Sequence, residues 1–234
     1  MRILVTGAAR GLGRALVETG LSWGIDVTAT VRKEEDLVPA REALPLARWI
    51  PLDLREPGDI ERAYELDVDE PLDILVNNAG VYDVGGGQYG PGRQSPGALR
   101  AEDALEVYLV NAVGPLLLVQ RWLPRLRASA TPGGGLVVNI TSLVGSLNCA
   151  VSPGHYFYGP SKAAQNWTTK ALARDFEGQI RVVGITPGWL RTRMGGTAAP
   201  SDAMEAAAAL LKLVQSLPRA ASGALLDIDG NPLP

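Results

Sequence analysis

Short apolar runs alternate with longer segments of helical periodicity along the chain. Runs rich in β-branched residues and leucine predict seven strands, at 3–5, 26–31, 48–52, 73–76, 135–140, 180–185 and 223–228. The segments between them predict helices at about 11–23, 34–43, 57–65, 100–127, 160–176 and 202–216. Apolar runs without alternation suit strands that are buried on both faces of a parallel sheet. We therefore predict an α/β fold with a doubly wound parallel sheet of about seven strands and helices on both faces.

Length, composition and charge limit the classes of protein to which the chain can belong. The chain has 234 residues, and no shift in composition divides it, so we expect a single domain over 1–234. Hydrophobic residues make up 46% and charged residues 20%, which is typical of a globular protein, and the net charge of -3 argues against a nucleic-acid partner. With no apolar stretch near the 18 residues of a membrane span and no signal-peptide core, we expect a cytoplasmic protein without a membrane partner. The single cysteine, Cys149, predicts no internal disulfide.

A glycine-rich segment follows the first predicted strand directly. Residues 6–13 read Thr-Gly-Ala-Ala-Arg-Gly-Leu-Gly and lead into a helical pattern. Glycines at this place let the backbone turn sharply, so that a pyrophosphate can approach the free N–H groups at a helix amino terminus. The spacing is G-x-x-x-G-x-G rather than the commoner G-x-G-x-x-G, and a purely structural tight turn would give the same pattern.

Further polar motifs follow the later strands. They are Asn77-Asn78-Ala79-Gly80, Thr141-Ser142, Tyr158-Gly159-Pro160-Ser161-Lys162 and Pro187-Gly188. Each lies at the carboxyl end of a predicted strand or just beyond it, which is where open α/β sheets bind ligands. The pattern therefore predicts one site at this edge of the sheet.

Together the TGxxxGxG and YxxxK motifs resemble those of the short-chain dehydrogenase/reductase family in its single-domain form. The resemblance extends over nearly the whole chain. It implies a Rossmann-like NAD(P)-binding fold and an oxidoreductase that interconverts a carbonyl and a secondary alcohol by hydride transfer. It also implies a small-molecule substrate and a homodimer or homotetramer that packs through the long helices near 102–127 and 160–176.

Four residues are the predicted catalytic group. Tyr158 and Lys162 are four apart and share one face of a helix, and an ammonium near a phenol lowers the phenol's pKa from its ordinary value of about 10. Such a phenol can give a proton to a carbonyl or take one from an alcohol, and Ser142 can hold the same oxygen. The resemblance adds Asn111, which would hold a water beside Lys162, and implies that Lys162 contacts the nicotinamide ribose. Pro160 lies between Tyr158 and Lys162, so we expect a regular helix only from about Pro160 onward.

The residues after the second predicted strand favour NADP(H) over NAD(H). An acidic residue usually holds the adenosine ribose of NAD, but here Thr30-Val31-Arg32-Lys33 contains none. Arg32 can pair with a 2′-phosphate, and Arg10 matches a second basic position in the phosphate-preferring members of the family. Both arginines could instead be solvated surface charges.

The resemblance assigns the remaining cofactor contacts by position. Asp53 and Leu54 would contact the adenine, Asn78 and Ala79 would line the adenosine side, and Thr192 would bond the nicotinamide carboxamide. The complete expected set is Gly7, Arg10, Gly11, Leu12, Gly13, Arg32, Asp53, Leu54, Asn78, Ala79, Gly80, Tyr158, Lys162, Pro187, Gly188 and Thr192. We predict no metal, because Asp227–Asn231 lacks most ligands of a calcium loop and is better explained as a terminal turn.

Two alternatives stay open from the sequence. A regulatory or morphogenetic protein could keep the fold without turnover, although it would need none of the four catalytic groups. An epimerase or lyase on the same fold would consume no net NADPH. The substrate is unspecified; the loops 82–98, 143–157 and 189–202 should line its pocket, with Trp189, Tyr156 and Leu147 favouring an apolar or aromatic carbonyl. His155, the only histidine, is either a substrate contact or a plain loop residue.

Overall fold

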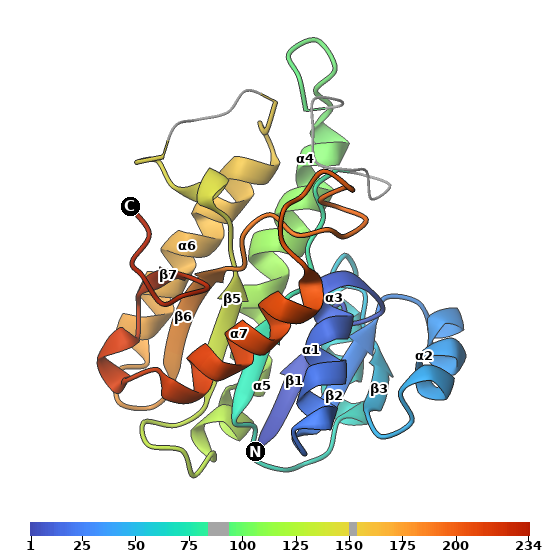
Figure 1. Cartoon of the computed structure of the whole chain (residues 1–234), viewed down its shortest axis with the longest axis vertical. Helices are drawn as coiled ribbons and strands as arrows, with labels where there is room; N and C mark the ends of the chain where they lie inside the picture. The colour runs from blue at the N-terminus through green and yellow to red at the C-terminus, as the bar shows by residue number, and fades with distance from the viewer. Residues whose placement is uncertain (84–93, 150–153) are drawn as a thin grey trace.

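The computed structural model describes residues 1–83, 94–149 and 154–234. Seven strands pair in parallel in the order β3-β2-β1-β4-β5-β6-β7, which confirms the predicted doubly wound sheet (Figure 1). The strands are β1 (Arg2–Val5), β2 (Asp26–Val31), β3 (Arg48–Pro51), β4 (Ile74–Asn77), β5 (Leu136–Ile140), β6 (Arg181–Thr186) and β7 (Leu225–Asp227). The helices are α1 (Gly11–Ser22), α2 (Leu37–Ala43), α3 (Pro57–Leu66), α4 (Ala101–Tyr108), α5 (Gly114–Arg127), α6 (Tyr158–Asp175) and α7 (Ala203–Ser216). Short helical turns are η1 (Glu34–Asp36), η2 (Leu109–Val113), η3 (Leu143–Gly145) and η4 (Arg219–Ala221).

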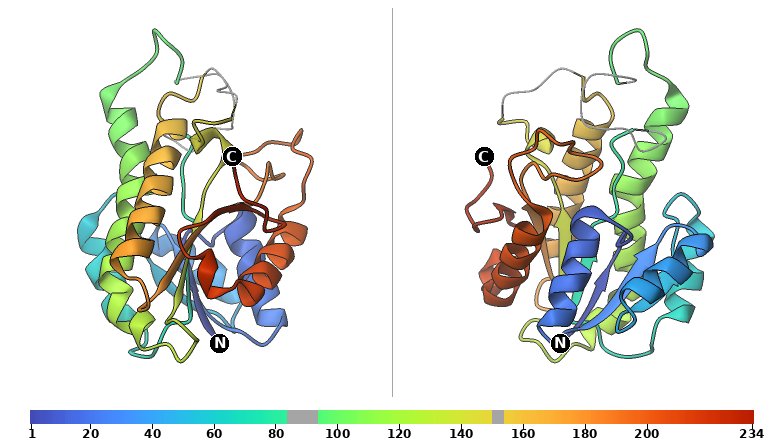
Figure 2. Two further views of the ribbon diagram at one scale, coloured as in Figure 1. Left: turned by 90° about the vertical axis from the view of Figure 1, so that its left-hand side faces the viewer. Right: turned by 45° about the vertical axis from the view of Figure 1, so that its right-hand side comes forward.

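Helices cover both faces of the sheet because its strands are apolar on both sides. In β1, Ile3 and Val5 pack in the core beneath α1 and α7, whereas Leu4 packs in the core beneath α3 and α5. Figure 2 shows these two helical layers with the sheet between them. Alternate side chains of one strand therefore enter different cores, which explains why the strands lack the polar alternation of a half-exposed sheet.

The predicted helix at 100–127 is divided into three pieces. The chain runs from α4 through the π-helical turn η2 into α5 without leaving the helical path. Pro115 is the second residue of α5 and has no N–H to donate; it directly follows the π turn, where the regular i→i−4 bonding pattern is already interrupted. The π turn buries Asn111 completely, so the irregular backbone coincides with a predicted site residue.

Helix α6 begins at Tyr158, two residues earlier than the proline suggests. Pro160 lies in the first turn, where backbone N–H groups have no intrahelical acceptor, so it does not interrupt the helix. Tyr158 and Lys162 are therefore both helical and both buried.

A turn follows β7. Asp227 accepts hydrogen bonds from the backbone N–H groups of Asp229 and Asn231, at 2.9 and 2.8 Å, and so closes the predicted terminal turn. Across residues 1–83, 94–149 and 154–234, no helix combines the length and apolarity that crossing a bilayer requires. The same ranges contain no cluster of His, Cys, Asp and Glu side chains that could hold a metal ion.

Candidate active site

A cavity of about 490 Å³ opens at the carboxyl edge of the sheet. All but one of the predicted site residues line it: Gly7, Arg10, Gly11, Leu12, Gly13, Arg32, Asp53, Leu54, Asn78, Ala79, Gly80, Ser142, Tyr158, Lys162, Pro187, Gly188 and Thr192. The exception is Asn111, which is buried beside the cavity. Segments far apart in sequence thus meet at one place because parallel strands end at the same edge.

The glycine turn is packed too tightly for side chains. Gly7 has a φ of +66°, and a Cβ there would lie 2.8 Å from the Cα of Ala79. A Cβ at Gly13 would lie 2.5 Å from Nδ2 of Asn78, which donates to the carbonyl oxygens of Thr6 and Gly7 at 2.7 and 3.2 Å. Asn78 therefore braces the turn with its amide as well as lining the cavity.

The amino terminus of α1 can accept an anion. Arg10 stands at its N-cap without a capping hydrogen bond from its side chain, and no acidic residue lies in the first turn. The first backbone N–H groups of a helix lack intrahelical partners and carry partial positive charge. Because these N–H groups border the cavity, the site fits the pyrophosphate of a dinucleotide.

Lys162 is the most perturbed titratable group of the site. Its side chain is buried, and Nζ donates to the carbonyl oxygen of Ile140 at 2.7 Å and to Oε1 of Gln165 at 3.1 Å. Burial lowers the pKa of Lys162 to about 7. Nζ lies 5.9 Å from the centroid of the Tyr158 ring, so its charge acts on that ring at short range.

Ser142 and Asn111 flank this pair in different ways. Ser142 follows β5, and its Oγ accepts a long hydrogen bond of 3.4 Å from the backbone N–H of Val144. The Asn111 amide is held at both ends by the Val81 backbone at 2.8 Å, and it also donates to Oγ of Ser161 at 3.1 Å. A Cβ at Gly80 would lie 3.3 Å from Asn111 Oδ1 and 3.9 Å from Lys162 Nζ, so both polar groups border the same glycine.

Four arginines line the cavity, two more than the sequence indicated, and one of them, Arg55, is paired with Asp53. Arg193, in the loop after β6, joins Arg10 and Arg32. Partial burial, and then the charges of Arg193 and Arg32, lower the pKa of Arg10, while Asp36 opposes this effect. Arg193 carried no recognisable sequence signal because its closeness to Arg10 arises only when the loop after β6 packs against the start of α1.

Asp53 is already engaged by a neighbouring cation. Arg55 binds its carboxylate through Nε, at 2.9 Å from Oδ1 and 3.0 Å from Oδ2, and through Nη2. Burial alone would raise the pKa of Asp53, but the hydrogen bonds from Arg55 outweigh it and the pKa is lowered. Arg55 also donates its backbone N–H to Oδ1 at 3.0 Å, so three donors occupy a carboxylate that has about four acceptor positions. The predicted adenine contact would take the remaining position and stays a prediction.

Gln94 holds the start of α6, a role that sequence reasoning missed. The residue is buried, and its Oε1 accepts from the backbone N–H groups of Phe157 and Tyr158 at 2.9 and 2.8 Å. Its Nε2 donates to the carbonyl oxygen of Tyr82, whose ring lies 5.4 Å from that of Tyr158. A glutamine 64 residues from its partner gives no local signal in a sequence.

His155 is in contact with Tyr82. Its Nδ1 is 3.0 Å from the Tyr82 hydroxyl, and burial lowers its pKa. Of the three residues expected to favour an apolar substrate, Trp189 lines the cavity, whereas Tyr156 and Leu147 are exposed and do not. Leu143, Val144 and Met194 line it instead. The expected pocket loops 82–98 and 143–157 lie partly outside the described residues.

The fold and this site define a dinucleotide-binding enzyme of the Rossmann type. A model of the short chain dehydrogenase family matches residues 1–203. The carbonyl reductase Sniffer of D. melanogaster has a similar structure, with a TM-score of 0.87 at 28% identity, covering 99% of this chain and 98% of that chain. An NADPH-bound carbonyl reductase from chicken fatty liver gives 0.86 at 29% identity, over 99% and 93%. Among curated relatives, C-signal of Myxococcus xanthus is 32% identical over 166 residues, 70% of this chain and 93% of that protein.

The chain therefore belongs to the short-chain dehydrogenase/reductase family, as its motifs predicted. It is an NAD(P)-dependent oxidoreductase, and enzymes of this kind act on small-molecule carbonyl or alcohol substrates.

Proposed function

We propose that this protein is an NADP(H)-dependent oxidoreductase that interconverts a carbonyl and a secondary alcohol, with Tyr158 as the general acid/base. The observation that carries the proposal is the buried Lys162, one helical turn from Tyr158, in the same cavity as the glycine turn. Burying a lysine side chain is unfavourable for folding, which favours a functional role for Lys162. The groups around it are those of a proton-transfer site.

Each polar group has a task in this mechanism. The nicotinamide, when bound, supplies or accepts the hydride. Ser142 hydrogen-bonds the substrate oxygen and holds it against Tyr158, whose hydroxyl gives that oxygen a proton during reduction and takes it back during oxidation. The positive charge of Lys162 favours the phenolate that remains. Asn111 keeps the backbone at Val81 in place beside Lys162.

The charges around the cavity favour the phosphorylated cofactor. Arg10 and Arg32 border it, and the acids that follow β2 are partly engaged elsewhere, because Glu34 pairs with Arg62 and Glu35 pairs with Lys33. Asp36 is the one acid of η1 that lines the cavity. Arg10 and Arg32 together outweigh this one acid, so the local charge attracts a 2′-phosphate. The NADPH-bound relative supports this preference.

A signalling role is the second candidate, because one relative bears the name C-signal. A protein that signals through its surface needs no acid/base group, whereas this chain has Ser142, Tyr158, Lys162 and Asn111 around one cavity. The two candidates differ in one respect that can be measured: only the enzyme depends on the Tyr158 hydroxyl.

The experiment combines cofactor binding with turnover. Saturating NADPH should raise the unfolding midpoint by about 5–10 °C, and NADH should raise it less. In a panel of aromatic and aliphatic aldehydes, ketones and quinones, Tyr158→Phe should lower kcat by about 100-fold or more while keeping the NADPH shift. Tyr156→Phe, which alters an exposed tyrosine outside the cavity, should keep full turnover.

Unchanged turnover in Tyr158→Phe would overturn the mechanism. A larger shift with NADH than with NADPH would overturn the cofactor preference alone. If neither cofactor shifts the midpoint and no carbonyl is reduced, the signalling candidate takes precedence.

A further inference from the structure

Arg193 extends from a loop that lies directly over the start of α1. A Cβ on Gly11 would be 3.3 Å from Cγ2 of Thr192, so the loop after β6 and the first turn of α1 are in close contact. The Thr192 hydroxyl accepts a hydrogen bond of 3.1 Å from the backbone N–H of Gly195, which fixes this part of the loop. Arg193 is the next residue, and it lines the same cavity as the first residues of α1.

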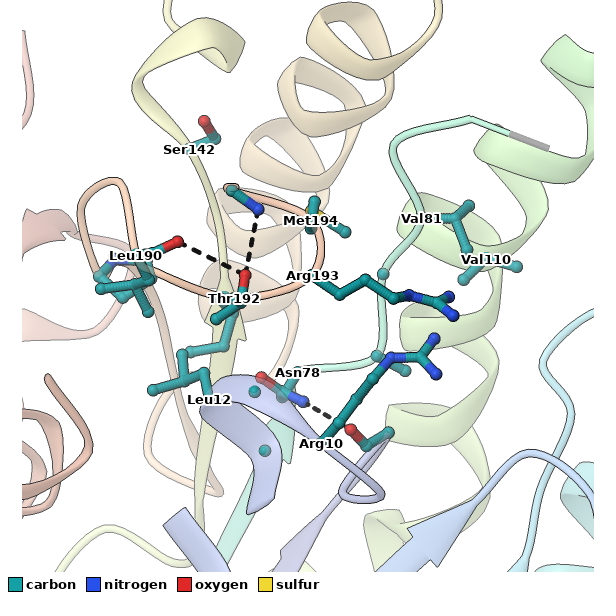
Figure 3. A pocket seen from close by; sticks show the side chains of 18 of the residues that line it. Arg10, Leu12, Asn78, Val81, Val110, Ser142, Leu190, Thr192, Arg193 and Met194 are labelled. Atoms are coloured by element: carbon teal, nitrogen blue, oxygen red, sulfur yellow. Dashed lines mark hydrogen bonds between the residues drawn. The ribbon is translucent and has the colours of Figure 1, made fainter. Parts of the chain in front are cut away.

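Arg193 and Arg10 project along the same wall of the cavity. Figure 3 shows the two side chains coming from different segments and pointing toward Val81 and Val110. Their like charges repel, and the charge of Arg193 helps to lower the pKa of Arg10. Within residues 1–83, 94–149 and 154–234, neither side chain has a hydrogen bond or an ion pair, whereas Arg191 in the same loop is 3.7 Å from Asp202. Two unpaired guanidinium groups that face one cavity favour an anion between them.

The sheet order indicates which phosphate Arg193 reaches. Strands β2 and β6 lie on opposite sides of β1, so Arg32 and Arg193 approach α1 from opposite halves of the sheet. The 2′-phosphate of the cofactor is expected on the β2 side, near Arg32. The pyrophosphate is expected at the amino terminus of α1, beneath the loop that carries Arg193.

We propose that Arg193 binds the pyrophosphate of the nicotinamide cofactor from the side opposite the α1 amino terminus. The proposal rests on the proposed cofactor site and deepens it. Arg193 then strengthens binding of both NADPH and NADH, whereas Arg10 and Arg32 select NADPH. In bound NADPH, the pyrophosphate at Arg193 and the 2′-phosphate at Arg10 together offset the repulsion between the two arginines, so the loop that carries Thr192 is held against the cofactor.

The test measures dissociation constants of NADPH and NADH by isothermal titration, without any substrate. Arg193→Ala should weaken both cofactors by a similar factor of about ten to a hundred, the range for one hydrogen bond to a charged group. Arg193→Lys keeps the positive charge but cannot form the bidentate hydrogen bonds of a guanidinium, so it should give a smaller loss of affinity for both cofactors. Arg10→Ala should weaken NADPH far more than NADH.

The matched control is Arg48→Ala, which removes an exposed arginine at the start of β3, at the opposite edge of the sheet. It should leave both constants unchanged. A loss in Arg193→Ala that is confined to NADPH would overturn the pyrophosphate assignment, and so would a loss no larger than that of the control. If the unaltered protein binds neither cofactor, the proposed function itself fails, which is a different result from normal binding that is insensitive to Arg193.

Discussion

At the scale of single residues, Lys162 is the group of the site whose burial is most unfavourable for folding. It is 4% exposed, and its only described partners are the carbonyl oxygen of Ile140 and Oε1 of Gln165. Gln165 is itself fully buried, and its Nε2 has no hydrogen-bond partner in the described part of the chain. Burying these groups is unfavourable for folding, so they are better explained by the chemistry of the site than by stability.

The lowered pKa of Lys162 predicts how stability depends on pH. The pKa is about 7 in the folded protein and near 10.5 when unfolded, so between these values the unfolded chain binds more protons. The free energy of unfolding should therefore rise from about pH 7 to about pH 9, by about 2 kcal/mol through this group. Urea denaturation of the wild type and Lys162→Met should show a smaller rise in the variant. Equal rises would contradict the prediction.

At the scale of elements, the site depends on how closely η3 packs on α6. A Cβ on Gly145 would lie 2.8 Å from both the carbonyl carbon and the Cβ of Lys162. The buried face of α6 is largely polar, with Ser161, Gln165, Asn166 and Thr169 fully or nearly covered. Such a helix gains less from apolar burial, so its position is set by close contacts and by hydrogen bonds such as those that Gln94 accepts from its first residues.

Gly145→Ala should therefore disturb Lys162 directly. The added methyl meets backbone atoms that cannot turn aside, so we expect a loss of about 1–3 kcal/mol in stability and a lower kcat. Gly58→Ala is the matched control, because nothing lies within 4 Å of its Cβ position. The control should be neutral or more stable by a few tenths of a kcal/mol, roughly. Thermal unfolding and turnover of both variants test this, and a fully active, stable Gly145→Ala would contradict it.

At the scale of the whole molecule, the outer side of α4, η2, α5 and α6 is unusually apolar. Leu105 and Trp167 are each 72% exposed, and Val113 and Leu116 are also exposed. Figure 2 shows α4, α5 and α6 side by side on one side of the molecule. Exposed apolar groups of this size commonly mark a protein interface, so the homodimer or homotetramer through these helices stays a prediction that this face can test.

The predicted assembly can be tested by one substitution that introduces a charge into the exposed apolar face. Trp167→Glu should convert a dimer or tetramer into a smaller species, because an unpaired carboxylate is costly in a buried interface. Trp23→Glu changes a tryptophan that is 40% exposed near the end of α1, away from this face, and should leave the mass unchanged. Analytical ultracentrifugation of the three proteins measures the mass. A wild-type monomer would show that the prediction is wrong.

The sequence by itself determined the sheet, its helical layers and most of the residues around the cavity. Strand runs and glycine spacing act locally, and the carboxyl edge of a parallel sheet collects whatever follows its strands. Ser142 and Tyr158 could therefore be placed at one site before the fold was described. Helix boundaries were less exact, since the π turn at Asn111 and the early start of α6 depend on packing.

Only the tertiary structure decided which distant residues support that site. Arg193 faces Arg10, and Gln94 caps α6. At the opposite edge, Asp67 binds both Arg2 and Arg125. The Arg193, Gln94 and Asp67 contacts join side chains from segments that are brought together only by folding, so neither periodicity nor motif spacing encodes them. The physical reason is that periodicity and motif spacing depend on residues close together in the sequence. Contacts between distant side chains depend instead on how separate helices, strands and loops pack against one another.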